Sequence, residues 1–329
     1  MRRLQYQPEL DGLRALAVMA VMGFHFLPGR VTGGSLGVDI FFVLSGYLVT
    51  RLIEAELQAT GGIDFAGFLR RRARRLLPAL IVVVGFYVLF APVLFPASAP
   101  RRWLTAVEAL TFVTNIRQSV WPVRSPLAHT WSLAVEGQFY LVFPFVMFAL
   151  RRAPRYRVVL LLTAPWALLL LGRSWWALHY PGSPASYYAT PFHATGLLIG
   201  AAVALAPAPP RWLAVPALAG LTALVFFGAT RVTFLLAIPV AEVLAAVIIA
   251  APPPGLAFEP LRRIGLISYG LYLWHIPAWV ALSRWASPDR AIGAVAFSLL
   301  AASLSYVLVE RPDLRRWLGR RLVPDASPS

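Results

Sequence analysis

The sequence of 329 residues contains no cysteine and no lysine. Without cysteine the chain has no disulfide, no thiolate nucleophile and no acyl-cysteine intermediate. All 30 basic residues are therefore arginines, which outnumber the 14 acidic residues and give a net charge of +16. Charged residues make up only 13% of the chain, whereas they make up about 25% of a typical soluble domain. This scarcity of charge excludes an ordinary soluble protein.

Apolar residues make up 59% of the chain, and its mean hydropathy is +0.68. Segments of about 20 mostly apolar residues can cross a bilayer as helices, and stretches rich in Pro, Gly and Arg separate ten such segments here. We therefore predict an all-α polytopic membrane protein, a bundle of about ten transmembrane helices in one domain covering residues 1–329. The predicted spans are residues 10–28, 36–55, 76–96, 127–150, 157–174, 190–206, 211–228, 233–250, 265–284 and 291–309.

The distribution of arginine predicts the orientation of these spans. Cytoplasmic termini place 20 arginines inside and nine outside, with Arg14 in the membrane, and loops rich in Lys and Arg favour the cytoplasm. Because the arginines alternate with apolar spans, nucleic-acid binding is not expected. The first span lacks a small-residue cleavage site and is expected to be retained. Residues 101–121 fit an eleventh span, a re-entrant segment or an interfacial amphipathic helix. A segment that does not span is expected, because it keeps the arginine bias consistent downstream.

The first span, "ELDGLRALAVMAVMGFHF" (residues 9–26), contains several charged or titratable groups. A charge at bilayer depth costs at least about 2.5–3.5 kcal/mol, so such residues usually have a role. Arg14 and His25 are eleven residues apart, which places them within about 20° of one helix face and about 16 Å apart along it. Asp11 precedes Arg14 by one turn and can pair with it. The pattern fits either a structural Arg–Asp pair with a packed histidine, or an anion-binding arginine and a proton acceptor on one face.

The second span contributes Asp39 and Ser45. Asp39 is expected at a depth similar to that of His25, where a carboxylate can orient an imidazole and stabilise its cation. Ser45 lacks the G-x-S-x-G elbow of a serine nucleophile, and Gly46 beside it fits close helix packing.

An arginine run, "FLRRRARRLLPAL", precedes the third span and has five arginines in six positions, 70–75. One interpretation is a topology determinant or a contact with anionic lipid. The other is recognition of a phosphorylated ligand, because arginine binds phosphate in a bidentate manner. Both interpretations remain open on spacing alone.

The fourth span, "HTWSLAVEGQFYLVFPF", carries Glu136 and Tyr140 in an apolar helix. A carboxylate at this depth must face the bundle, either as a catalytic group or as a counter-ion for arginine. His275 lies among aromatic residues in "LISYGLYLWHIPAW", where it either packs or donates a hydrogen bond across helices. The five histidines are widely scattered and show no zinc spacing, so no metal site is predicted. The aromatic outer loop at residues 173–191 fits contact with a sugar face or with the lipid interface.

These stretches, in this order, resemble the acyltransferase-3 family of integral membrane acyltransferases, and the resemblance covers almost the whole chain. The resemblance is carried by "LDGLRALAV" with its Arg14-x10-His25 spacing, "GVDIFFVLSGYLVT", "RRRARRLLPAL", "HTWSLAVEGQFYL", "LISYGLYLWHIP" and "ERP".

The resemblance implies a ten-helix bundle in a bacterial plasma membrane. It also implies transfer of an acyl group, often acetyl, from acyl-CoA to a hydroxyl of a cell-envelope glycan or another acceptor. The family requires the Arg-x10-His pair and an RxxR motif, which falls on Arg72 and Arg75 when aligned on Pro78. Gly137 departs from the family pattern, where many members have a second glutamate. The chain resembles the stand-alone form, without a C-terminal hydrolase-like domain.

The resulting hypothesis is an acyltransferase in which His25 is the general base and acyl-CoA is a substrate, with no tightly bound cofactor. The expected catalytic residues are His25, Asp39 and Glu136. The expected substrate-binding residues are Asp11, Arg14, Ser45, Arg72, Arg75, Tyr140 and His275. Its expected partners are membrane lipid, acyl-CoA and a glycan. The alternative is a transporter or flippase that uses the same polar residues as a substrate or proton path.

Overall fold

A computed structural model of the chain describes residues 6–228, 231–283 and 289–310. These residues form helices joined by turns and 3-10 segments, with no strand among them, which confirms the all-α prediction. The helices are α1 (Pro8–Phe26), α2 (Gly37–Thr60), α3 (Phe65–Leu94), α4 (Arg102–Leu110), α5 (Thr114–Val120), α6 (Trp131–Leu150), α7 (Arg155–His179), α8 (Ala185–Tyr188), α9 (Thr190–His193), α10 (Thr195–Leu205), α11 (Ala214–Phe227), α12 (Arg231–Ala250), α13 (Glu259–Leu266), α14 (Ser268–Ala281) and α15 (Asp289–Ser305).

A helix lies within or across each of the ten predicted spans, but fewer helices meet the requirements for crossing a bilayer. Five helical segments of the described chain are long and apolar enough, and the pair α13 and α14, bent by 67°, would make six. The α1 helix has 19 residues but carries three charged side chains. The apolar stretches of α10, α11 and α12, the last of these over Leu236–Ala250, are short. The structure therefore supports a membrane-spanning helical protein, and the count of ten spans stays a prediction.

The segment 101–121 folds into two short helices. The α4 and α5 helices have nine and seven residues, fewer than the about 20 that cross a bilayer. Phe112 separates them with a φ of 57°, a conformation that is uncommon for any residue except glycine. This geometry agrees with the predicted non-spanning segment.

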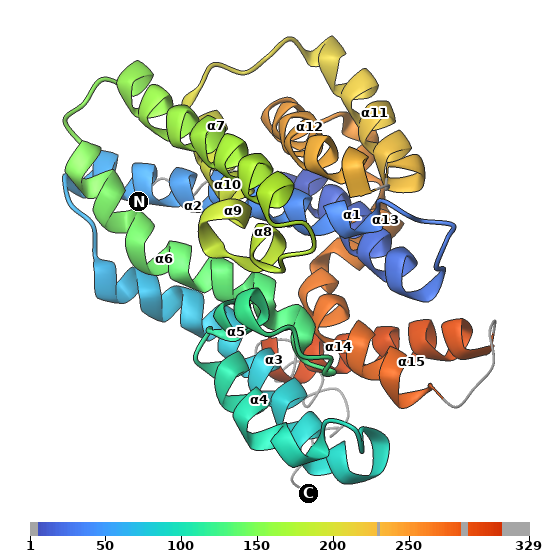
Figure 1. Cartoon of the computed structure of the whole chain (residues 1–329). Coiled ribbons are helices and arrows are strands. Elements are labelled where there is room, and N and C mark those ends of the chain that lie inside the picture. The colour runs from blue at the N-terminus through green and yellow to red at the C-terminus, as the bar shows by residue number, and fades with distance from the viewer. Residues whose placement is uncertain (1–5, 229–230, 284–288, 311–329) are drawn as a thin grey trace, which may run out of the picture.

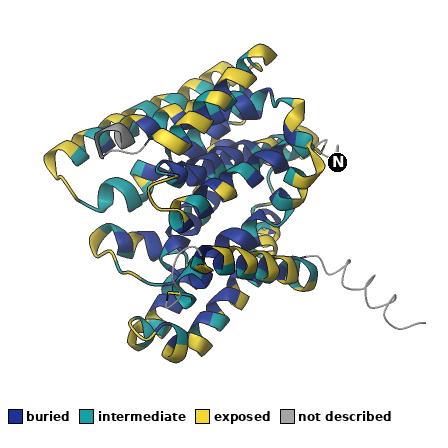
Figure 2. Ribbon diagram, turned by 90° about the vertical axis from the view of Figure 1, so that its right-hand side faces the viewer, coloured by how far each residue is buried: buried dark blue, intermediate teal, exposed yellow. Residues whose placement is uncertain are grey.

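The α2 helix lies at the centre of the molecule, with α11 and α12 on one side and α3 to α5 on the other (Figure 1). The 18-residue apolar stretch of the segment containing α2 is 78% buried. The corresponding stretch is 17% buried in α7 and 22% buried in the segment containing α15. Glycines allow α10 to pack directly on α2: a Cβ at Gly46 would lie 2.0 Å from the carbonyl oxygen of Leu197. Figure 2 shows the buried residues gathered inside and exposed ones on the outer helices, whose apolar side chains suit a lipid environment.

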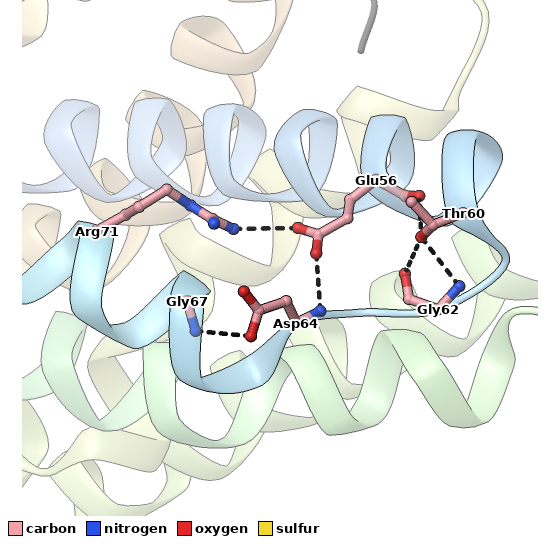
Figure 3. A network of polar contacts seen from close by, with 6 residues as sticks. All are labelled: Glu56, Thr60, Gly62, Asp64, Gly67 and Arg71. Atoms are coloured by element: carbon pink, nitrogen blue, oxygen red, sulfur yellow. Dashed lines mark hydrogen bonds and ion pairs between the residues drawn. The ribbon is translucent and has the colours of Figure 1, made fainter.

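The turn between α2 and α3 places the arginine run at the start of α3 (Figure 3). Gly61 ends α2 with a φ of 72°, and the Asp64 carboxylate caps α3 by accepting from the amide of Gly67 at 2.8 Å. Glu56 joins the two helices, because one carboxylate oxygen accepts from the amide of Asp64 at 2.7 Å and the other from Arg71 at 3.1 Å. The arginines at both chain ends, including Arg311 of the "ERP" motif, lie outside the described residues.

Candidate active site

Two cavities lie inside the helical bundle. The first, called here the arginine cavity, has a volume of about 590 Å³. The second, called here the histidine cavity, has a volume of about 860 Å³. Both volumes are in the range of small-molecule sites, about 300–1,000 Å³. Polar residues of the arginine cavity are Tyr6, Asp11, Arg14, Ser45, Arg71, Arg72, Arg74, Arg75, Ser132, Glu136, Tyr140, Ser268, Tyr269, Tyr272, Tyr306 and Glu310. Polar and titratable residues of the histidine cavity are His25, Thr32, Ser35, Ser98, Arg124, Ser125, His129, Trp131, Tyr187, Tyr188, Tyr272, His275 and Ser283.

Ser45, Glu136 and Tyr140 form a hydrogen-bonded triangle in the arginine cavity. The Ser45 and Tyr140 hydroxyls both donate to the same carboxylate oxygen of Glu136, and the two hydroxyl oxygens lie 2.6 Å apart. Ser45 lies on α2, while Glu136 and Tyr140 lie one turn apart on α6. Glu136 therefore faces the bundle, as its intramembrane position required.

The arginines of this cavity come from two helices. Arg14 on α1 pairs with Asp11 at 2.5 Å, and Asp11 also accepts from the hydroxyl of Tyr6 at 2.6 Å. Arg72 on α3 lies with its guanidinium 5.6 Å from the centre of the Tyr140 ring, a cation–π distance. Arg75 lines the same cavity. The structure thus brings Arg14 and the RxxR arginines into one positively charged space, which suits an anionic ligand.

His25, His129 and His275 form a cluster in the histidine cavity. The ring centroid of His275 lies 5.1 Å from that of His25 and 5.2 Å from that of His129. The Nδ1 of His25 lies 2.9 Å from the carbonyl oxygen of Val21, and the Nδ1 of His275 lies 2.6 Å from that of Tyr272. Because a carbonyl only accepts, each Nδ1 carries the hydrogen, which leaves the lone pair on Nε2 in a neutral ring. No cluster of three or more potential ligands in the described ranges could hold a metal ion.

His129 was missed as a candidate by sequence reasoning. It belongs to the 3-10 turn that precedes α6 and is 7% exposed. Among the described residues, neither ring nitrogen has a hydrogen bond of ordinary geometry, although the carbonyls of Pro126 and Leu273 lie near the ring. The only sequence feature that could have indicated a role for His129 is its position at the start of the "HTWSL" motif. Nothing in the local pattern indicates its contact with His275 on α14.

Val38 and Tyr272 are the two described residues that line both cavities. The Tyr272 hydroxyl lies 2.6 Å from Oγ of Ser132 and donates to the carbonyl oxygen of His129 at 2.9 Å. These bonds hold the ring between α14 and the start of α6, where the cavities meet. Arg14 and His25 line one cavity each, so the face of α1 that they share runs along both.

The structure does not bring Asp39 to His25. Asp39 lines neither cavity, and its carboxylate accepts from Nε2 of His193 on α9 at 3.1 Å. Both side chains are almost fully buried. From the sequence, Asp39 was paired with His25 because both were expected at a similar depth on neighbouring helices. Depth alone does not determine the direction in which a side chain points. The side of α2 that carries Asp39 faces α9, while Ser45 points towards α6.

Packing against a neighbouring segment explains why position 137 is a glycine in this chain. A Cβ at this position would lie 2.9 Å from Cδ1 of Phe112, the residue that separates α4 from α5. A glutamate at position 137 would displace that ring. Glu136 therefore stands alone as the carboxylate at this level of α6.

The fold and these cavities define a membrane-embedded helical protein with an internal polar site. A model of the acyltransferase-3 family, described as "Acyltransferase domain", matches residues 7–310, and the chain belongs to this family.

Similar curated proteins include a peptidoglycan O-acetyltransferase OatA of Listeria monocytogenes, which is 34% identical over 94% of this chain and 56% of its own length. A putative peptidoglycan O-acetyltransferase YrhL of Bacillus subtilis is 31% identical over 94% of this chain and 55% of its own. An O-acetyltransferase OatA of Staphylococcus aureus is 31% identical over 94% and 57%. The chain thus spans little more than half the length of these relatives. No solved structure matches it significantly.

Proposed function

We propose that this protein is a bacterial membrane O-acetyltransferase that moves an acetyl group from acetyl-CoA to a hydroxyl of a cell-envelope glycan. The glycan class comes from the named relatives, which are peptidoglycan O-acetyltransferases. The observation that carries the proposal is the meeting of two cavities of different chemistry at Tyr272 and Val38. One cavity suits a polyanionic donor and the other supplies bases for an acceptor hydroxyl.

The donor occupies the arginine cavity in this proposal, and this cavity opens to the cytosol. Arg14, Arg72 and Arg75 bind the phosphates of coenzyme A through charge-assisted hydrogen bonds. The buried Nε of Arg72 has no partner within the described residues, so it is available to a phosphate oxygen. The pantetheine arm then extends past the Ser45–Glu136–Tyr140 triangle and brings the thioester to Tyr272.

The acceptor occupies the histidine cavity, on the outer side of the bundle. The Nε2 of His25 takes the proton of the acceptor hydroxyl, and the oxygen attacks the thioester carbon. The new C–O bond forms first, and the electron pair of the thioester C=O bond moves to oxygen as an oxyanion. The carbonyl then re-forms as the C–S bond breaks, and the proton passes from His25 to the leaving sulfur of coenzyme A. At the junction of the cavities, the Tyr272 hydroxyl turns its single hydrogen from the His129 carbonyl to the oxyanion during the reaction.

The test is acetyl-CoA consumption by the full chain in nanodiscs, with a peptidoglycan fragment as acceptor. We expect acetyl transfer by the wild type, and loss of transfer in His25→Ala with coenzyme A binding retained. A wild type that neither binds coenzyme A nor consumes acetyl-CoA would overturn the proposal. That outcome would favour a transporter or flippase, which has no need of a coenzyme A site.

A further inference from the structure

Three aromatic rings form a continuous wall of the histidine cavity. Trp131, at the start of α6, has its ring centroid 5.0 Å from that of Tyr187 and 5.4 Å from that of Tyr188. The two tyrosine rings lie 5.0 Å apart and almost perpendicular, at 89°. All three side chains line the cavity that also contains His25 and His275.

The structure divides the aromatic segment at residues 173–191, predicted as an outer loop, between the end of α7 and a following part that contains α8, and the two parts have different surroundings. Trp175 and Tyr180 are 53% and 51% exposed on the surface of the described chain and line neither cavity. Tyr187 and Tyr188, further along the same segment, face the histidine cavity instead. The second part of the segment therefore belongs to the interior site rather than to the lipid interface.

One buried ion pair holds the backbone of Tyr187 in place. The Nδ1 of His193 donates to the carbonyl oxygen of Tyr187 at 2.5 Å, and its Nε2 donates to Asp39 at 3.1 Å. His193 also packs its ring against Trp131, with centroids 4.7 Å apart.

A second buried network holds the backbone after Tyr188. Asn115 donates to the carbonyl oxygen of Tyr188 at 3.3 Å and to the hydroxyl of Thr190 at 2.8 Å. Gln138 closes the network by accepting from Thr190 at 2.5 Å and donating to Asn115 at 2.9 Å. Polar groups buried in this way are costly unless every partner is in place, so the two networks specify one position for a segment of two four-residue helices.

We propose that Trp131, Tyr187 and Tyr188 form a sugar-binding subsite, called here the aromatic wall, which holds a pyranose ring of the acceptor beside His25. This inference rests on the proposed function. Aromatic faces pack against the apolar C–H side of a sugar ring, while the ring hydroxyls turn to polar groups. Thr32 and Ser35 line the same cavity and supply hydroxyls for that purpose. Asp39 and His193 are positioning residues, since they act on the sugar only through Tyr187 and Trp131.

The test uses the full chain in nanodiscs with acetyl-CoA and an N-acetylglucosamine oligosaccharide as acceptor. Tyr188→Leu and Trp131→Leu are each expected to raise KM for the oligosaccharide about tenfold and to leave KM for acetyl-CoA within about twofold. The matched control is Trp175→Leu, which removes an exposed aromatic ring of the same outer region. Equilibrium dialysis with labelled oligosaccharide measures acceptor binding without turnover, and we expect binding by the wild type that Tyr188→Leu weakens to a similar degree.

The positioning role has its own readout. His193→Gln is expected to raise KM for the acceptor and leave KM for acetyl-CoA unchanged, and its effect is not additive with that of Tyr188→Leu because both act through the aromatic wall. Equal shifts in both KM values would assign His193 a purely structural role.

The outcomes separate this inference from the proposed function. Acetyl-CoA consumption combined with oligosaccharide binding that is insensitive to Tyr188→Leu and Trp131→Leu overturns the aromatic wall alone. Absence of oligosaccharide binding by the wild type also overturns it. Oligosaccharide binding that depends on the wall, without any acetyl-CoA consumption, keeps the subsite and removes the proposed acetyl transfer.

Discussion

Arg14 and His25 lie on one face of α1 and yet line different cavities. Arg14 faces the arginine cavity and His25 the histidine cavity, with Val38 and Tyr272 at the boundary between them. A helix rises about 1.5 Å per residue, so their eleven-residue spacing extends along both spaces. One helix therefore presents the Arg14 cation to the arginine cavity and the His25 imidazole to the histidine cavity. The predictions below follow from this division.

Replacing His25 with glutamine removes the proposed general base and keeps a polar side chain of similar size. We expect kcat to fall by about 10²–10⁴-fold, the usual contribution of a positioned base, while coenzyme A affinity stays the same. Measurement of kcat and coenzyme A binding by the nanodisc-embedded variant checks this result. His179→Gln is the matched control, because His179 is exposed on α7 and lines neither cavity. A His25→Gln variant with wild-type kcat would exclude the base.

Replacing Arg72 or Arg75 with alanine removes a cation from the arginine cavity. A hydrogen bond to a charged group contributes about 1.5–3 kcal/mol, so we expect KM for acetyl-CoA to rise about 10- to 100-fold. KM for the glycan acceptor should stay constant. Arg70→Ala is the control, since Arg70 is an exposed arginine of the same run outside the cavity lining. Equal effects of all three variants would indicate a topology or lipid role for the run instead.

Replacing Tyr272 with alanine should connect the two cavities, because the ring lies at their boundary and would be removed. The chain has no native cysteine, so a single Ser35→Cys variant reports access to the histidine cavity directly. We expect this cysteine to react with a small impermeant thiol reagent from one side only, and from both sides when Tyr272→Ala is added. Tyr272→Phe keeps the ring and should keep one-sided labelling. Two-sided labelling without any change at Tyr272 would show that the ring is not a barrier.

Replacing Gly46 with alanine should destabilise the protein. The added Cβ would lie 2.0 Å from the carbonyl oxygen of Leu197, so α10 has to move away from α2. We expect a loss of several degrees in Tm, measured by thermal unfolding in detergent. Gly85→Ala is the matched control inside α3, where a Cβ meets no atom within 4 Å. Alanine is the better helix former, so this variant should be as stable as the wild type or more so. Equal Tm values for both variants would contradict the close approach of α2 and α10.

Several features of the site followed from the sequence because they depend on local pattern alone. The apolar segments predicted helices in the right places, and the spacing along α1 placed Arg14 and His25 on one face. Because a charge that faces lipid is costly, the sequence predicted that Glu136 faces the bundle interior. The structure has it there, hydrogen-bonded to Ser45 and Tyr140. The motif order also identified the family, which the match over residues 7–310 confirms.

Other features needed the tertiary structure, because they join helices far apart in the chain. Asp39 was assigned to His25 from its depth, whereas the packing of α2 against α9 pairs it with His193. His129 gave little local signal, and it joins the histidine cluster only because α14 brings His275 within 5.2 Å.

The sequence by itself determined the helical membrane architecture and the acyltransferase family. It also determined which polar side chains must face away from lipid. These properties follow from hydrophobicity and helical period, which are local. The tertiary structure alone decided that the polar residues divide between two cavities, and that Tyr272 and Val38 lie where these meet. Rotation of each helix about its axis is set by side-chain packing against its neighbours, and this rotation selects the partner of every buried polar group.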